Sequence, residues 1–236
     1  MPENRFLSTL DPADAARLGP ALRVKTLARD DLVASEGRPV EKVMLPVNCI
    51  LSVIAVLRDG REVETRTICF EGGYGLLHAL GSPLSYERVI AQVPGDAYEL
   101  PLAALAQAAQ ASPSLVNHIV SFAQASLIQS AQTTACNAVH SAEQRMCRWL
   151  LMSQDRLGSD LLPLTQEHLS IMLGVQRTTV TAIAKDLQGR GLILNGRGRI
   201  RIIDREGLQR VVCECYEALE AGVAQMVGFR PAEQAG

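Results

Sequence analysis

The chain has 236 residues, a formal net charge of −2 and 47% hydrophobic residues. This length favours two domains over one, and the apolar content is sufficient for packed cores. A charged content of 20% with nearly balanced signs excludes a disordered or tail-like protein. A non-specific nucleic-acid coat would carry a clear positive net charge, so that class is not indicated either.

The start of the chain, M-P-E-N-R-F-L-S, has neither an apolar run nor a signal-peptide layout. No stretch has the roughly 20 apolar residues that a membrane-spanning helix needs. We therefore expect a cytoplasmic protein without a membrane partner. Six cysteines in a long chain with few loops do not indicate a disulfide framework.

Short apolar runs separated by turn signals occupy residues 22–100, after a short helical lead over residues 1–20. The Asp59-Gly60 dipeptide between two β-rich runs, residues 50–57 and 63–70, is a hairpin signal. Many short strands at this spacing predict a small antiparallel barrel or roll.

The pattern becomes helical after this region, with an alanine-rich helix over residues 101–111. Ser112 and Pro113 are suited to the cap and the first position of a further helix, which continues without Gly or Pro to about residue 138. Its apolar stripe indicates a dimerisation face, with burial against the preceding domain as the alternative. The stripe consists of Val116, Ile119, Ala123, Leu127 and Ser130.

Two short helices joined by a glycine are predicted between residues 165 and 188, after a helix that begins at the capping box Ser141-x-x-Gln144. The Thr165 hydroxyl can cap the first of the two, and we expect Gly174 to supply the turn. The second helix has one apolar stripe and one polar face, which is the pattern of a helix-turn-helix. The apolar stripe consists of Val180, Ile183, Ala184 and Leu187.

A hairpin rich in arginine follows this motif. Two strand-like runs, residues 192–194 and 200–203, flank the turn Asn195-Gly196-Arg197-Gly198, which predicts a wing. Between residues 165 and 205 there are seven basic residues and three acidic ones, a local net charge of +4. Positive charge concentrated on one module of an acidic chain is typical of phosphate contact.

This stretch resembles the winged helix-turn-helix of the Crp/Fnr family of bacterial transcription regulators. The matching residues are Leu164-Thr165, Leu173-Gly174, Arg177, Thr179-Val180, Leu187, Gly191-Leu192-Ile193 and Gly196 to Gly198. The resemblance implies an α+β fold: an N-terminal antiparallel β-roll, a long dimerisation helix and a C-terminal winged helix-turn-helix. It divides the chain into a cyclic-nucleotide-binding-like sensor (1–111), a dimerisation helix and hinge (112–140), a DNA-binding domain (141–222) and a frayed tail (223–236).

The resemblance also implies a homodimer that reads a palindromic site, with double-stranded DNA as partner and RNA polymerase as a further partner if the protein is an activator. Residues expected to read bases are Gln176, Arg177, Thr178 and Thr181. Residues expected to hold phosphates are Thr165, Gln166, Lys185, Arg197 and Arg199. The best-known cyclic-AMP receptor has an acid at the position of Thr178 and an arginine at that of Ala182, so its operator cannot be assumed here.

The region that corresponds to the family's phosphate-binding cassette also departs from it. Cyclic-AMP-binding relatives have an early Gly-Glu pair and a late Arg-Ser or Arg-Thr pair, whereas here no acid follows Gly73 and the late pair is Ser85-Tyr86. Glu87 would oppose a phosphate. We therefore expect no cyclic AMP in the usual pose and no cofactor; an unknown effector and a roll without a ligand remain equal alternatives. The candidate effector pocket consists of Gly73, Tyr74, Gly75, Leu76, Tyr86 and Arg88.

The cysteines give no metal prediction. The first is Cys49, so the N-terminal cluster of an Fnr-like iron–sulfur sensor is missing. Cys213 and Cys215 fall in a predicted last helix over residues 205–222, on different sides, which favours one packed and one exposed thiol. Two ligands are too few for a metal site. A thiol or metal redox sensor with a DNA output nevertheless remains an alternative.

Motifs of catalysis are missing as well. There is no glycine-rich phosphate loop, no H-E-x-x-H sequence and no G-x-S-x-G elbow, and the four histidines are scattered. We expect no enzyme. The rival to a DNA reader is a ligand-sensing or protein-interaction module without direct DNA readout.

Overall fold

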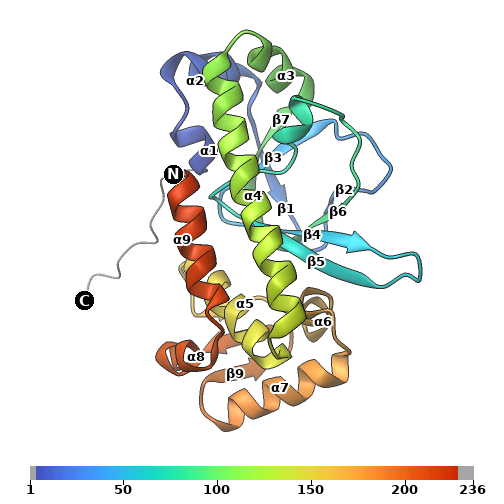
Figure 1. Ribbon diagram of the computed structural model, residues 1–236, viewed down its shortest axis with the longest axis vertical. Coiled ribbons are helices and arrows are strands. Elements are labelled where there is room, and N and C mark those ends of the chain that lie inside the picture. The colour runs from blue at the N-terminus through green and yellow to red at the C-terminus, as the bar shows by residue number, and fades with distance from the viewer. Residues whose placement is uncertain (1–3, 228–236) are drawn as a thin grey trace.

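The computed structural model describes residues 4–227, which form an N-terminal β-roll and a C-terminal helical domain joined by one long helix (Figure 1). The roll has seven strands: β1 (Arg23–Leu27), β2 (Leu32–Ala34), β3 (Lys42–Pro46), β4 (Ile50–Val56), β5 (Glu62–Ile68), β6 (Arg88–Val93) and β7 (Gly95–Pro101). They form an antiparallel sheet of order β1-β7-β3 and another of order β2-β6-β4-β5. The predicted roll is therefore confirmed.

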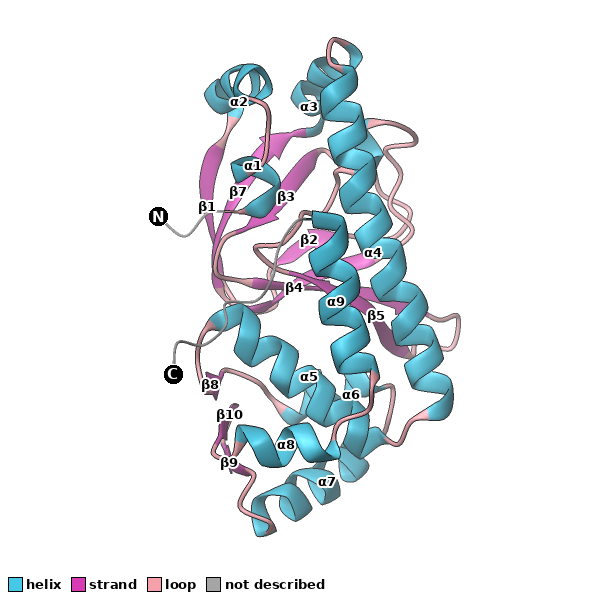
Figure 2. Ribbon diagram, turned by 60° about the vertical axis from the view of Figure 1, so that its left-hand side comes forward, coloured by secondary structure: helices cyan, strands magenta, loops and turns pink. Residues whose placement is uncertain are grey.

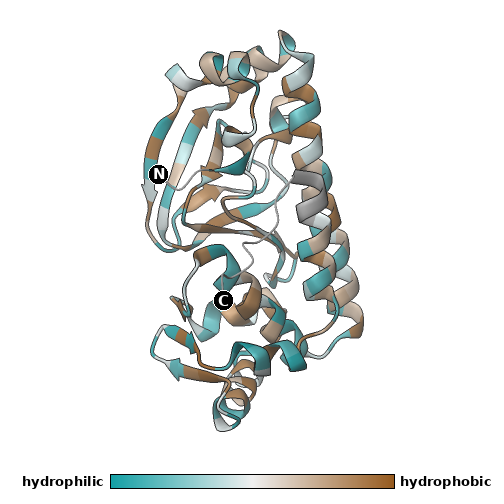
Figure 3. Cartoon of the chain, turned by 90° about the vertical axis from the view of Figure 1, so that its left-hand side faces the viewer, coloured by the Kyte–Doolittle hydropathy of each residue, from teal (hydrophilic) through white to brown (hydrophobic). Residues whose placement is uncertain are grey.

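The β4–β5 hairpin forms where the Asp59-Gly60 signal predicts it. Gly60 has a φ of 83°, in the left-handed region that glycine enters without a steric penalty. Val56 pairs with Glu62 across the turn. Hydrophilic and hydrophobic residues alternate along strands at the edge of the roll (Figure 3).

Several helices pack against one side of the roll. They are α1 (Arg5–Ser8), α2 (Pro12–Leu18), the 3-10 turns η1 (Gly19–Ala21) and η2 (Leu77–Ala79), α3 (Leu102–Gln110) and α4 (Pro113–Val139). The Phe6 ring is buried and meets the Phe122 ring of α4 edge-on, with 5.3 Å between centroids. Ser112 caps α4 by accepting a hydrogen bond from the Leu115 amide. The predicted cap, and the long helix after it, are confirmed.

One face of α4 is buried in its own chain and the opposite face is exposed. Ile119, predicted on the dimerisation stripe, is completely buried in the roll core and cannot contact a partner. Val116 packs partly against the same core, whereas Leu127 is 70% exposed. The apolar spacing was thus interpreted correctly as helical, but it included residues of the face that packs inward.

The C-terminal domain contains a helix-turn-helix and a three-stranded wing sheet of order β8-β10-β9. The elements are α5 (Ala142–Leu157), β8 (Leu161–Leu162), α6 (Gln166–Leu173), α7 (Arg177–Gly189), β9 (Ile193–Gly196), β10 (Arg199–Ile202), α8 (Arg205–Val211) and α9 (Cys215–Val227). Ser141 and Gln144 form the predicted capping box. Trp149 is buried in the core of this domain, as expected.

The predicted single last helix is wrong. The backbone becomes extended at Val212, so α8 ends there and α9 begins at Cys215 and runs beside α4 (Figure 2). Both Cys213 and Cys215 are buried, which also corrects the expectation of one packed and one exposed thiol. The break turns both thiols toward the end of α4. Residues 223–227 of the expected tail belong to α9, and 228–236 lie outside the described residues.

The roll and the C-terminal domain share two polar contacts and an apolar cluster. Trp149 donates from Nε1 to Oε1 of Glu64 on β5 at 3.2 Å. Arg156 of α5 is paired with Glu71 at 2.6 Å. Ile50 and Cys69 of the roll pack in the same apolar cluster as the core of the C-terminal domain. None of the described helices has the length and apolar character needed to cross a membrane.

Candidate DNA-binding surface and effector cavity

The first helix of the helix-turn-helix, α6, begins as the sequence predicts. The Thr165 hydroxyl accepts a hydrogen bond from the His168 amide at 3.1 Å and so satisfies one free donor of the first turn. Gly174 ends α6 with a φ of 59°, a left-handed conformation that lets the chain turn at once into α7.

Helix α7 has an apolar and a polar side. Val180, Ala184 and Leu187 are fully buried, and Ile183 packs partly against the same cluster. On the other side the four predicted base-reading residues are all exposed: Gln176, Arg177, Thr178 and Thr181.

A polar contact fixes the two helices relative to each other. The Thr181 hydroxyl lies 2.9 Å from Oε1 of Gln166 on α6 and also 2.9 Å from the Arg177 carbonyl oxygen of its own helix. Gln166 therefore keeps its amide nitrogen for another acceptor while its oxygen faces α7. The contact places the first turn of α6 next to the middle of α7, which is the arrangement in which one helix can approach a phosphate and the other a groove.

The wing continues this surface. Strands β9 and β10 pair with Ile200 opposite Asn195, and Gly198 allows the turn by adopting a φ of 69°. Ile200 and Ile202 point into the core, so Arg199 and Arg201 share the opposite, exposed face. Arg201 was missed as a phosphate candidate, although strand alternation with Arg199 would have identified it.

Ion pairs remove part of the local positive charge. Arg190 pairs with Glu143 at 2.5 Å and with Asp186 at 3.0 Å, and Arg205 pairs with Asp155 at 2.8 Å. Five other cations are exposed and form no ion pair with any residue of the described range 4–227: Arg177, Lys185, Arg197, Arg199 and Arg201. The remaining charge is concentrated on α7 and the wing. This surface can hold a polyanion.

The roll contains a cavity of about 260 Å³ between the segment after β5 and helix α4. Four of the six predicted effector residues line it, namely Gly73, Tyr74, Gly75 and Leu76. The other two do not: Tyr86 is 77% exposed, and Arg88 is paired with Glu62. The sequence missed Arg66, Leu77, His78, Glu87, Phe122, Ala123 and Ser126, which also line the cavity.

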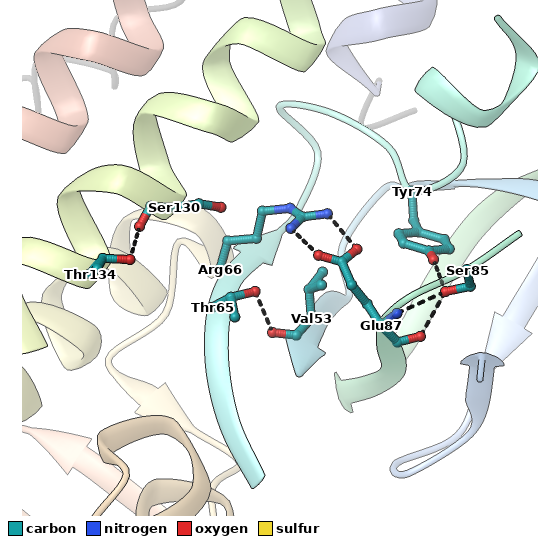
Figure 4. Close-up of polar contacts among 8 residues, drawn as sticks. All are labelled: Val53, Thr65, Arg66, Tyr74, Ser85, Glu87, Ser130 and Thr134. Carbon is teal, nitrogen blue, oxygen red and sulfur yellow. Dashed lines mark hydrogen bonds and ion pairs between the residues drawn. The ribbon is translucent and has the colours of Figure 1, made fainter. Parts of the chain in front are cut away.

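An ion pair between Arg66 and Glu87 lines this cavity. Nη1 and Nη2 of Arg66 lie 2.6 Å and 2.9 Å from the two Glu87 carboxylate oxygens, and the two side chains point toward each other (Figure 4). Ser85 holds this segment, because its hydroxyl bonds to the carbonyl and the amide of Glu87 and lies 2.7 Å from the Tyr74 hydroxyl. An anion would have to displace Glu87 before Arg66 could bind it bidentately.

Together the fold and this surface define a winged helix-turn-helix protein with a β-roll of the cyclic-nucleotide-binding type. Residues 144–211 match the family model of the Crp-like helix-turn-helix domain. No curated protein sequence matches the chain.

Solved structures show the same architecture over most of the chain. FixK2 from Bradyrhizobium japonicum is 18% identical, with a TM-score of 0.70 over 81% of this chain and 98% of its own. The c-di-GMP-responsive global regulator CLP from Xanthomonas campestris is 17% identical, with a TM-score of 0.67 over 81% and 99%. A transcriptional regulator of the CRP family from Thermus thermophilus, TTHB099, is 16% identical, with a TM-score of 0.67 over 88% and 98%. The chain has the Crp/Fnr fold, and its C-terminal domain is a Crp-like helix-turn-helix domain.

Proposed function

We propose that this protein is a homodimeric transcription regulator that reads a palindromic DNA site through the major groove. The observation that carries the proposal is the exposed polar face of α7 beside a wing with three arginines that are free of ion pairs within the described residues. An α-helix fits the major groove, where base edges present distinct donor and acceptor patterns. Two copies would read half-sites about 34 Å apart on one face of the duplex.

Residue roles follow from position. Arg177, Gln176, Thr178 and Thr181 are proposed to read bases, because they start or face outward from α7. Phosphates are proposed to be held from both sides of this helix by Thr165, Gln166, Lys185, Arg197, Arg199 and Arg201. Phosphate contacts fix the register of the protein on the duplex, and base contacts supply the sequence preference.

The effector is proposed to differ from cyclic AMP in its usual pose, because the Glu87 carboxylate neutralises Arg66 in the cavity. A ligand that leaves this ion pair in place would bind against the apolar and aromatic side of the cavity, where Phe122 and Leu76 lie.

Selection of bound duplexes from a random DNA pool tests the proposal, in separate reactions with and without cyclic nucleotides. Enrichment of a palindromic site without any nucleotide is expected. If no duplex is enriched in any reaction and binding shows no salt dependence, the rival protein-interaction module is correct.

Arg177→Ala is expected to reduce discrimination at one base pair of each half-site by about 10- to 100-fold, because one bidentate contact to a base contributes about 1–3 kcal/mol. Arg197→Ala is expected to weaken binding to all sequences similarly and to lower the salt dependence. Fluorescence anisotropy on a set of single-base operator variants measures both effects.

Arg38→Ala serves as the matched control, because Arg38 is also an exposed arginine but lies on the roll. It is expected to bind like the wild type. If Arg177→Ala and Arg197→Ala gave the same profile across the operator set, the assignment of base and phosphate roles would be wrong.

A further inference from the structure

Three cysteines and one histidine meet at the point where α4 ends. Cys136 lies in the last turn of α4 and His140 is its C-cap residue; Cys213 lies in the link between α8 and α9, and Cys215 begins α9. One ligand atom from each of the four lies within 4.8 Å of the others. Among the described residues this is the only group of three or more metal-binding side chains of this kind. Because the chain breaks between α8 and α9, the Cys213 and Cys215 thiols both lie at the end of α4.

The spacing within the group fits a tetrahedral site. Sγ of Cys136 lies 3.6 Å from Sγ of Cys213, and Sγ of Cys215 lies 3.5 Å from Nδ1 of His140. With zinc–sulfur bonds of about 2.3 Å and zinc–nitrogen bonds of about 2.0 Å, a tetrahedron has sulfur–sulfur edges of about 3.8 Å and sulfur–nitrogen edges of about 3.5 Å. The Cys136–Cys213 and Cys215–His140 distances are within about 0.2 Å of these lengths, and all four ligand atoms lie within 4.8 Å of one another.

The surroundings of the four residues orient them as ligands. Nε2 of His140 lies 3.2 Å from Oε1 of Glu214, which leaves Nδ1 directed at Cys215. A carboxylate on the second ring nitrogen of a metal-binding histidine is the usual way in which proteins fix its tautomer. The Gln132 amide donates to Sγ of Cys215 at 3.0 Å, and such a donor stabilises a thiolate.

The charge of a nearby arginine is also compatible with a metal at this site. Three thiolates, one neutral imidazole and a divalent cation have a net charge of −1. The Arg148 guanidinium is buried, lies within electrostatic range of Cys136 and forms no ion pair within the described residues. An anionic metal centre would place negative charge near this buried cation, whose acidic neighbour Glu64 is itself buried.

A disulfide between two of these cysteines would account for fewer of the observed contacts than a metal site. A Cys136–Cys213 disulfide would use two of the four groups and would give no role to Cys215 or to the His140–Glu214 contact. The surroundings of these cysteines also differ from those of the other buried cysteines. Cys49, Cys69 and Cys147 each lie within a large apolar cluster. The remaining cysteines, Cys136, Cys213 and Cys215, form a separate cluster of their own. We infer that Cys136, His140, Cys213 and Cys215 form a Cys3His site for a thiophilic divalent cation of the zinc type.

The site would link the end of α4 to the start of α9, beside the turn from α4 into the DNA-binding domain. Metal binding replaces three thiol protons, which pass to the buffer, with three metal–sulfur bonds. These bonds would fix the position of the C-terminal domain relative to α4. An effect of the metal on DNA affinity rests on the proposed function, whereas the existence of the site does not.

Titration of the reduced, metal-free full-length protein with Co²⁺ tests the site. One Co²⁺ per chain is expected, with the visible absorption of tetrahedral Co²⁺ and a thiolate-to-cobalt charge-transfer band that Zn²⁺ abolishes by displacement. Cys213→Ala is expected to reduce Co²⁺ affinity about 100-fold or more. Glu214→Gln, a change at a side chain that is 78% exposed, is expected to reduce it about 10- to 100-fold without loss of the tetrahedral spectrum.

Cys147→Ala is the matched control, since Cys147 is equally buried but lies in the apolar core of the C-terminal domain. It is expected to bind Co²⁺ like the wild type. Circular dichroism shows whether each variant is folded, and Glu214→Gln keeps the test valid if Cys213→Ala does not fold. The inference is overturned if the reduced protein binds no Co²⁺, if the control and Cys213→Ala bind it equally, or if oxidation gives a Cys136–Cys213 disulfide in a protein that never binds metal.

DNA affinity with and without Zn²⁺ is a separate measurement. A Zn²⁺-dependent change in the wild type that is missing in Cys213→Ala supports coupling of the site to DNA binding. Equal affinities would remove the coupling and leave the Co²⁺ result unaffected, and loss of DNA binding under all conditions would count against the proposed function alone.

Discussion

Glu64→Gln is expected to make the protein about 3 kcal/mol more stable than the wild type at pH 8 while leaving its stability at pH 4.5 almost unchanged. Burial raises the pKa of Glu64 from 4.5 to about 7, and this exceeds the opposite effects of hydrogen bonds from Ser52 and Trp149 and of the nearby Arg148 and Arg156 charges. The difference of about 2.5 pKa units corresponds to about 3 kcal/mol.

The sign follows from proton binding. Between about pH 4.5 and pH 7 the folded protein keeps the Glu64 proton, whereas the unfolded chain has already lost it. The folded state therefore binds more protons, and the free energy of unfolding falls as the pH rises through this window. Glutamine cannot ionise. Its amide oxygen can accept from Trp149 and its nitrogen can donate to the Ser52 hydroxyl, so the contacts are kept.

Urea unfolding at pH 5 and pH 8 measures the effect. The fluorescence of Trp149 can follow unfolding, because Trp149 is the single tryptophan of the chain and donates a hydrogen bond to Glu64. Burial raises the pKa of Glu220 to about 7 as well, so some pH dependence should remain in the variant. Glu36→Gln, at an exposed position of the roll, is the control and should unfold like the wild type. Identical pH dependence in Glu64→Gln and the wild type would contradict the burial argument.

Local chemistry explains which parts of this structure could be predicted from the sequence. Helix caps at Ser112, Ser141 and Thr165 and the turns at Gly60 and Gly174 depend on neighbouring residues, and all five are present. The polar face of α7 also follows from its own periodicity. These features need no knowledge of what lies across the fold.

Features that depend on distant partners could not be predicted. The Arg66–Glu87 pair joins strand β5 to the residue just before β6, and nothing in either segment alone indicates the other. The thiol cluster brings Cys136 together with Cys213, which is 77 positions away. The cluster could not be predicted without the break between α8 and α9, because one continuous helix would direct Cys213 and Cys215 to different sides.

The apolar periodicity of the long helix α4 does not identify which of its faces would meet a partner. The helix has an apolar stripe on the face that packs into the roll and a second one on the exposed face, so spacing alone cannot say which stripe meets a partner. The structure separates them: Ile119 is completely buried, whereas Val120 and Leu127 are 40% and 70% exposed. Val120 and Leu127 are one heptad apart, and Ala131 and Ala138 repeat the same interval nearby on the exposed face.

Leu127→Glu is therefore expected to convert the proposed dimer into monomers. A two-fold interface between parallel copies of α4 would place each seam residue near its own copy, so the substitution would bring two carboxylates together in a desolvated seam. Affinity for a palindromic site should fall by about 100-fold or more, because the second half-site no longer benefits from the high effective concentration that the dimer provides. Sedimentation velocity gives the mass, and titration of full and half sites gives the affinities.

Leu32→Glu is the matched control, because Leu32 is also an exposed leucine, at 59%, but lies on the edge strand β2 of the roll. It should remain dimeric and bind the palindrome like the wild type. Affinity for a single half-site should be nearly equal in Leu127→Glu and the wild type, since the exposed face of α7 is unchanged. If Leu127→Glu remained a dimer, the seam would lie elsewhere than on the exposed face of α4. If it became a monomer and kept its full affinity for the palindrome, two-fold reading itself would be wrong. The half-site measurement thus separates the contribution of dimerisation from that of recognition by α7.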